Sequence, residues 1–215
     1  MKAKIPSGIF LALLSLAGAD TGWAITLGLS PASQTITAGN PFDVDVVISG
    51  LHAPDPDEIL SGYDINISYD ASMLTATGVD FGSFLGGLSD SLQDPDFTTA
   101  GLFNIFEVSF LSDLDLDTLQ GDSFTLATLH FTAKTAGTSA LTITNADLTG
   151  FSDLSTTFPN PLTVDQYANS GVTVEPRTAV PEPASWALMG AGFIAGLAHK
   201  RRQRAARGQH FKNIG

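Results

Sequence analysis

The feature that most constrains this chain is a two-residue period in its apolar side chains between residues 25 and 175. From 42 to 49 the even-numbered residues are apolar, and from 63 to 69 the odd-numbered ones are. Successive side chains of a β-strand point to opposite faces, so this period is typical of strands with one buried face. Seven more segments are predicted to be strands: 25–29, 33–37, 74–81, 102–111, 123–133, 139–144 and 171–174.

Turn-forming residues separate these nine segments, and no helical stretch of useful length lies between them. The predicted fold is therefore all-β, a jelly-roll-like β-sandwich of about nine strands. Two segments break their own alternation, one after Ile105 and one between Leu126 and Leu129. A β-bulge, or a strand buried on both faces, would explain each break. Residues 145–170 alternate little and are predicted to form a loop over one end of the sandwich.

The charge of the chain is unevenly distributed. Residues 25–175 contain 20 of the 22 acidic residues and a single basic one, Lys134, which gives this segment a formal charge of −19. Such a surface repels nucleic-acid phosphates and anionic lipid, so no nucleic-acid partner is expected. Cations, neutral glycans and basic proteins remain possible ligands. The chain has no cysteine, which excludes disulfides, a thiol nucleophile and a thiolate metal site.

The first 24 residues have the pattern of a secretory signal peptide. Lys2 and Lys4 precede an apolar core from 9 to 17, and small residues follow it. Cleavage after Ala19 and cleavage after Ala24 both fit this pattern. The Sec translocon and signal peptidase are therefore expected partners, and residues 25–175 are expected to be one exported domain.

The C-terminal region combines a short motif, an apolar run and a basic cluster. The apolar run, 184–198, has 15 residues. As a helix it reaches about 22 Å, short of the roughly 30 Å hydrocarbon core, so it is a marginal transmembrane helix. The motif before it is Val180, Pro181, Glu182 and Pro183, and the basic residues after it are Lys200, Arg201, Arg202, Arg204 and Arg207. The positive-inside rule predicts that this basic end stays in the cytoplasm.

This order of features resembles the PEP-CTERM sorting signal of Gram-negative bacteria, whose exported proteins are processed by the membrane protease-transpeptidase exosortase. The resemblance covers 181–207, after a linker at 176–180, and implies cleavage near residues 181–183 with loss of the helix. The chain would then be held at the inner membrane transiently before it reaches the cell surface or the medium. Residues 209–215 extend the tail beyond the family pattern. The alternative is an ordinary tail anchor.

A second resemblance lies within the exported domain. Residues 62–74, GYDINISYDASML, and 124–134, FTLATLHFTAK, are similar to strands of cohesins. Cohesins are jelly-roll sandwiches related to carbohydrate-binding modules, and they dock the dockerin modules of cellulosomes. The resemblance implies a cohesin-like domain over 25–175. It does not assign the partner surface.

Calcium is the one cofactor that the residues suggest. Asp113, Asp115 and Asp117 stand at alternate positions, and Asp122 follows shortly after. Calcium takes six to eight hard oxygen ligands, so clustered carboxylates with backbone carbonyls are candidate ligands. The alternative is a solvated acidic ribbon.

Catalytic signals are sparse. His52 and His130 are the only histidines of 25–175, and neither stands in a catalytic motif. The sequence therefore predicts a non-enzymatic envelope or matrix protein that binds an extracellular protein or polysaccharide. One alternative is a polysaccharide hydrolase, which needs a pair of buried carboxylates facing a cleft. Another is a structural matrix protein without a discrete ligand.

Overall fold

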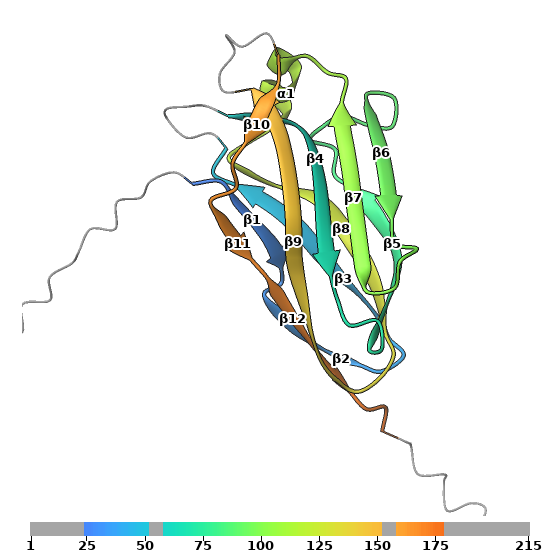
Figure 1. Cartoon of the computed structure of the whole chain (residues 1–215). Helices are drawn as coiled ribbons and strands as arrows, with labels where there is room; N and C mark the ends of the chain where they lie inside the picture. The colour runs from blue at the N-terminus through green and yellow to red at the C-terminus, as the bar shows by residue number, and fades with distance from the viewer. Residues whose placement is uncertain (1–23, 52–57, 152–157, 179–215) are drawn as a thin grey trace, which may run out of the picture. The chain divides into compact units, whose positions relative to one another are not determined.

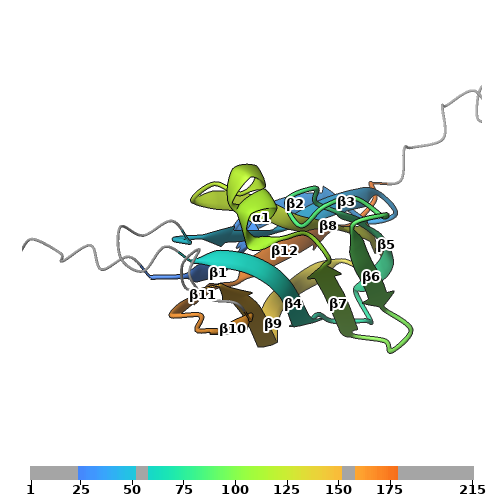
Figure 2. The same ribbon diagram turned by 90° about the horizontal axis from the view of Figure 1, so that it is seen from above.

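The computed structural model describes residues 24–51, 58–151 and 158–178. In these residues, twelve strands form two sheets (Figure 1). One sheet has the order β11-β1-β3-β8-β5, from β1 (Thr26–Ser30), β3 (Pro41–Ser49), β5 (Leu74–Phe81), β8 (Ser123–Ala133) and β11 (Gln166–Ala168). The other has the order β2-β12-β9-β4-β7-β6, from β2 (Ser33–Thr37), β4 (Ile59–Ser68), β6 (Ser91–Asp96), β7 (Leu102–Ser109), β9 (Gly137–Phe151) and β12 (Ser170–Glu175), and β10 (Asn160–Leu162) pairs with β9. The predicted sandwich is confirmed, and Figure 2 shows its two layers from above.

All nine predicted segments are strands, and three further strands were not predicted. β6 is an edge strand whose only apolar residue apart from Pro95 is Leu92, and β10 and β11 have three residues each. None of the three strands therefore shows an alternation of apolar and polar residues that could be recognised in the sequence. The predicted loop at 145–170 is wrong in its first part, because β9 continues to Phe151. The register between β4 and β9 shifts next to Asn145, and this bulge moves the buried positions from odd to even numbers.

A short helix, α1 (Asp113–Leu119), replaces the alternating acidic segment. Ser112 caps it, because its Oγ accepts a hydrogen bond from the Asp115 backbone amide and donates one to Asp115 Oδ2. This N-cap overrides the two-residue alternation. Leu116 is the buried residue of the helix.

The core lies between the sheets and has Phe131 of β8 near its centre. The Phe131 ring stacks on Phe42 of β3 and meets Tyr69 and Phe103 edge-on. Aromatic contacts of this kind add stability beyond the area that they bury. Phe103 comes from the opposite sheet, so these rings join the two layers.

The two breaks in alternation have different causes. In β8 a bulge is confirmed, because the register with β3 skips Leu126 between Val46 and Val47. In β7 neither predicted cause is right, since its register with β4 and β6 is unbroken. Its inward positions are Phe103, Ile105 and Glu107, so an acid takes the third buried position.

Glu107 is 1% exposed, and its carboxylate accepts three hydrogen bonds. Ser91 Oγ and Gln93 Nε2 of β6 donate to Oε1 at 2.8 and 2.9 Å, and Tyr63 Oη of β4 donates to Oε2 at 2.9 Å. Burial raises the pKa of Tyr63, and the Glu107 charge raises it further, so the phenol remains a donor. The carboxylate therefore links β6 and β4 through β7.

The chain divides into two compact units, residues 1–176 and 177–215. Of the second unit, only 177 and 178 are described. No helix in the described residues is long and apolar enough to cross a membrane, and the apolar run 184–198 lies outside them.

Substituting Glu107→Leu should lower the free energy of unfolding by about 3 kcal/mol, because Tyr63, Ser91 and Gln93 lose their bonds to a charged acceptor and keep only neutral acceptors, each at 3.3 Å. Glu107→Gln keeps an acceptor and should cost about 1 kcal/mol. Urea denaturation of residues 25–176 measures both values. Glu175→Leu is the control at an exposed position and should change stability by no more than about 0.5 kcal/mol. Equal stability of the Leu and Gln variants would contradict the role of the network.

Candidate functional site

The outward face of β6, β7, β4 and β9, in the front layer of Figure 1, carries side chains in regular rows. Inward positions on these strands fill the core, so the alternate positions face solvent. Across β6, β7, β4 and β9 the rows read Leu92, Val108, Gly62 and Thr149; then Asp94, Phe106, Asp64 and Asp147; then Asp96, Asn104, Asn66 and Asn145. We call these twelve residues the row face.

The first row contains a hollow of about 330 Å³, formed where Gly62 has no side chain. Its lining residues besides Gly62 are Tyr63, Asp64, Phe106, Glu107, Val108, Asp147 and Thr149. A Cβ at Gly62 would lie 3.1 Å from both the Glu107 carbonyl oxygen and Thr149 Oγ1. Only glycine therefore fits this position without displacing its neighbours, and the hollow is a consequence of that glycine.

Two carboxylates stand directly opposite each other beside the hollow, Asp64 on β4 and Asp147 on β9. Their hydrogen-bond donors are neutral amides, Asn104 Nδ2 to Asp64 Oδ1 at 2.6 Å and Asn145 Nδ2 to Asp147 Oδ2 at 3.0 Å. Among the described residues no cation pairs with either one. Like charges directly opposite each other destabilise a sheet, so this pair favours a cation from outside.

Apolar side chains adjoin the hollow on the β6 side. Leu92 is 51% exposed and lies opposite Val108, and Phe110, two residues beyond Val108, is 68% exposed. Exposed apolar residues gathered on one face, with polar residues around them, are typical of a protein interaction site. Exposed apolar side chains and a hollow bordered by two carboxylates therefore lie side by side, on the row face and at its edge.

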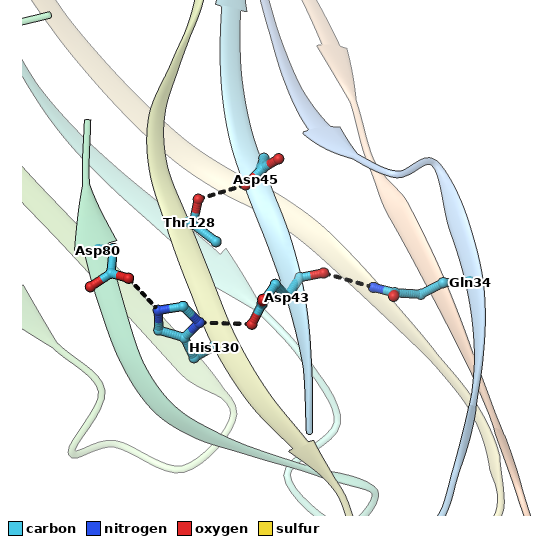
Figure 3. A network of polar contacts seen from close by, with 6 residues as sticks. All are labelled: Gln34, Asp43, Asp45, Asp80, Thr128 and His130. Carbon is cyan, nitrogen blue, oxygen red and sulfur yellow. Dashed lines mark hydrogen bonds and ion pairs between the residues drawn. The ribbon is translucent and has the colours of Figure 1, made fainter. Parts of the chain in front are cut away.

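The opposite sheet carries a different polar group on its outward face (Figure 3). The ring of His130 on β8 lies between Asp43 of β3 and Asp80 of β5, 2.7 Å and 3.1 Å from their carboxylate oxygens. Beside it Thr128 Oγ1 donates to Asp45 Oδ1 at 2.6 Å. His130 is therefore an outward-facing residue with a carboxylate oxygen within hydrogen-bond distance of each ring nitrogen. His52 lies outside the described residues.

The predicted calcium ligands are not gathered at one point. Asp113, Asp115 and Asp117 lie on α1, where a rotation of about 100° per residue turns Asp115 away from the other two. Asp122 follows the helix. No group of three or more His, Asp or Glu side chains in the described part of the chain is placed to hold a metal ion. Calcium binding stays a prediction, without a ligand set from these residues.

The hydrolase alternative needs two buried carboxylates that face a cleft. Within 24–51, 58–151 and 158–178, Glu107 is the only buried acid, and its oxygens are bonded to Tyr63, Ser91 and Gln93. The described residues therefore supply no such pair.

The aromatic residues in the connections and at the strand ends outside the row face differ in exposure. Phe84 and Phe97 pack against the core, and Phe151 is buried in a small cluster with Ile59 and Leu116. Phe158 and Tyr167 are exposed. Neither of the two lies on the row face.

The predicted processing and topology residues lie outside the described residues. They are Val180, Pro181, Glu182 and Pro183, with the basic residues Lys200, Arg201, Arg202, Arg204 and Arg207. Sequence reasoning missed the row face. The alternation of Asp64 and Asn66 with Ile65 and Ile67 identifies outward positions, but their neighbours on β7 and β9 depend on the cross-strand register.

Comparisons with solved structures agree with this fold. The seventh ScaB type I cohesin from Pseudobacteroides cellulosolvens aligns with a TM-score of 0.57 and 14% identity, over 74% of this chain and 97% of that one. The sixth cohesin of scaffoldin B from Acetivibrio cellulolyticus, solved in complex with a dockerin, gives 0.52 and 17%, over 71% and 99%. A cohesin from Clostridium acetobutylicum, solved in solution, gives 0.50 and 23%, over 73% and 94%.

Family models match two parts of the chain. The PEP-CTERM protein-sorting motif matches residues 179–202. No curated protein matches the chain. The cohesin domain model matches residues 28–168, about two thirds of the chain. The chain therefore belongs to the cohesin domain family and carries a PEP-CTERM sorting motif.

Proposed function

We propose that this chain is an exported docking protein whose row face binds a basic protein partner of the dockerin type. The observation that carries the proposal is the hollow over Gly62, mostly apolar and bordered by the carboxylates of Asp64 and Asp147, next to the exposed Leu92 and Phe110. Open sheet faces with an apolar contact and unpaired charges suit a protein surface of opposite charge.

The hollow fits a lysine or arginine side chain of the partner. Its aliphatic stem would lie against Phe106 and Val108, and its charged head would lie between Asp64 and Asp147. A cation there offsets the repulsion between the two carboxylates. The formal charge of −19 over 25–175 attracts a basic partner from a distance and speeds its association.

Two observations favour a protein of the dockerin type over a polysaccharide. The chain is a cohesin, and the aligned Acetivibrio cohesin was solved with a dockerin bound. Glycan binding usually relies on exposed aromatic platforms, whereas the row face offers one half-buried ring, Phe106, and Phe110 at its edge.

Delivery to the cell surface would follow the sorting motif. The signal peptide directs export, the C-terminal helix holds the chain at the inner membrane for a time, and exosortase cuts near Pro181 to Pro183. Removing the basic tail leaves the acidic domain outside the cell, free to meet its partner.

Charge reversal in the hollow tests the docking proposal. Residues 25–176, wild type and Asp64→Lys/Asp147→Lys, are used as bait in the culture medium of the source cells. A protein captured by the wild type should bind the variant at least about tenfold more weakly, because the two new lysines repel the basic side chain of the partner. Calorimetry with the captured protein measures the change in Kd. A cooperative thermal unfolding transition of the variant establishes that the variant is folded.

The matched control for that experiment is Asp122→Lys/Glu175→Lys, which makes the same change in net charge away from the row face. It should retain most of the affinity. If both double substitutions weaken binding equally, binding depends on the overall charge of the domain, which would contradict the proposal that the partner binds in the hollow. Retention of a polysaccharide instead of a protein would contradict a protein partner.

Intact-mass analysis of the protein from envelope and medium tests the delivery step. The mature chain should end between Pro181 and Pro183, and replacing Pro181, Glu182 and Pro183 by alanine should leave the basic tail attached. A wild-type mass that includes Lys200 to Arg207 would identify a permanent tail anchor.

A further inference from the structure

His130 makes two contacts that a neutral imidazole cannot satisfy together. Nδ1 lies 2.7 Å from Asp43 Oδ1, and Nε2 lies 3.1 Å from Asp80 Oδ2 (Figure 3). A neutral ring has one N–H group, so its second nitrogen would turn a lone pair toward a carboxylate oxygen. Both contacts are hydrogen bonds only in the protonated ring.

The charged groups around the ring all favour this protonated form. They are Asp43 and Asp45 on β3 and Asp80 on β5, and the neighbours on β8 are neutral threonines. The hydrogen bond to Asp43 raises the pKa of His130 most, partial burial lowers it by less, and the bond to Asp80 raises it further. Lys134 is not part of this group, because its Nζ donates to the Ala71 carbonyl oxygen.

The contact to Asp80 holds an edge strand at a weak point. β5 is the last strand of its sheet, and its register with β8 shifts between Ala76 and Gly78. Gly78 pairs with His130 itself. A bulge interrupts the backbone hydrogen bonds between two strands. A side-chain hydrogen bond next to the bulge therefore contributes a larger share of the contacts that keep the edge strand on the sheet.

β5 leads into the connection 82–90, which runs to β6. A hollow of about 460 Å³ lies between β5, this connection and β6, and its lining includes Asp80, Gly82, Leu88 and Gln93. Asp80 thus takes part both in the contact to His130 and in the wall beside the connection.

We propose that His130, Asp43 and Asp80 form a pH-dependent clasp that fixes edge strand β5, and with it the connection 82–90, on the sheet. Protonation closes the clasp, and loss of the proton breaks one of its two hydrogen bonds. This device goes beyond docking, since it acts on the sheet opposite the row face and needs no partner.

The direction of the pH effect follows from the raised pKa. Below the ordinary value of 6.5 His130 is protonated in both the folded and the unfolded chain, so the clasp contributes fully. As pH rises above 6.5 through the folded pKa, the contribution is lost. Within 25–175 only His52 and His130 have ordinary side-chain pKa values between 5 and 8.

Amide hydrogen exchange of residues 25–176 between pH 6 and pH 8.5, corrected for the intrinsic rate, tests the clasp. Protection of the β5 amides in the wild type should fall about two- to fivefold over this range. In His130→Gln it should be low and independent of pH. His52→Gln is the matched control and should behave as the wild type.

A nitrogen-15 titration of the His130 ring provides the second readout. The ring should titrate above the value of a free histidine, and Asp80→Asn should lower its pKa, whereas Asp45→Asn, a carboxylate without a bond to the ring, should lower it less. A ring that titrates at or below the free value overturns the proposal. So does β5 protection with the same pH dependence in wild type and His130→Gln.

Discussion

The carboxylate of Glu107 lies inside the sandwich and holds three strands of the row face in register. It accepts hydrogen bonds from Ser91 and Gln93 on β6 and from Tyr63 on β4. A slip of one residue in a strand turns every outward side chain inward. The buried acid opposes such a slip, because moving Glu107 outward would break its three charge-assisted hydrogen bonds and leave Tyr63, Ser91 and Gln93 only their neutral acceptors at 3.3 Å. The hollow over Gly62 and the facing pair Asp64 and Asp147 exist only in this register.

The excess of acidic residues gives the two faces of the sandwich different properties. With one lysine in 25–175, most carboxylates have no lysine or arginine in this segment to pair with, and Asp64 and Asp147 accept hydrogen bonds from neutral amides instead. On the row face this leaves Asp64 and Asp147 open to a cation from a partner. On the opposite face the scarce positive charge is a histidine, whose charge depends on pH. Recognition and pH response therefore arise from the same composition but lie on different sheets.

The sequence was sufficient for the fold and for little of the site. Alternation identified nine strands, because burial on one face leaves a period of two. The break between Leu126 and Leu129 indicated either a bulge or a strand buried on both faces, and the structure has the bulge. It failed where the local pattern was overridden: the N-cap Ser112 starts a helix at 113–119, and the bulge at Asn145 concealed the second half of β9. Glu107 was missed because an acid at an inward position looks like a break in the strand. The row face depends on pairing between distant strands, which no local pattern contains.

The central claim is that the row face, and not the opposite sheet, meets the partner. NMR cross-saturation from an unlabelled captured partner to the methyl groups of residues 25–176 tests it directly. The account predicts that Leu92 and Val108 lose intensity, while Val47 and Thr128 on the opposite sheet keep theirs. Loss of intensity at Val47 and Thr128, with Leu92 and Val108 unchanged, would contradict it.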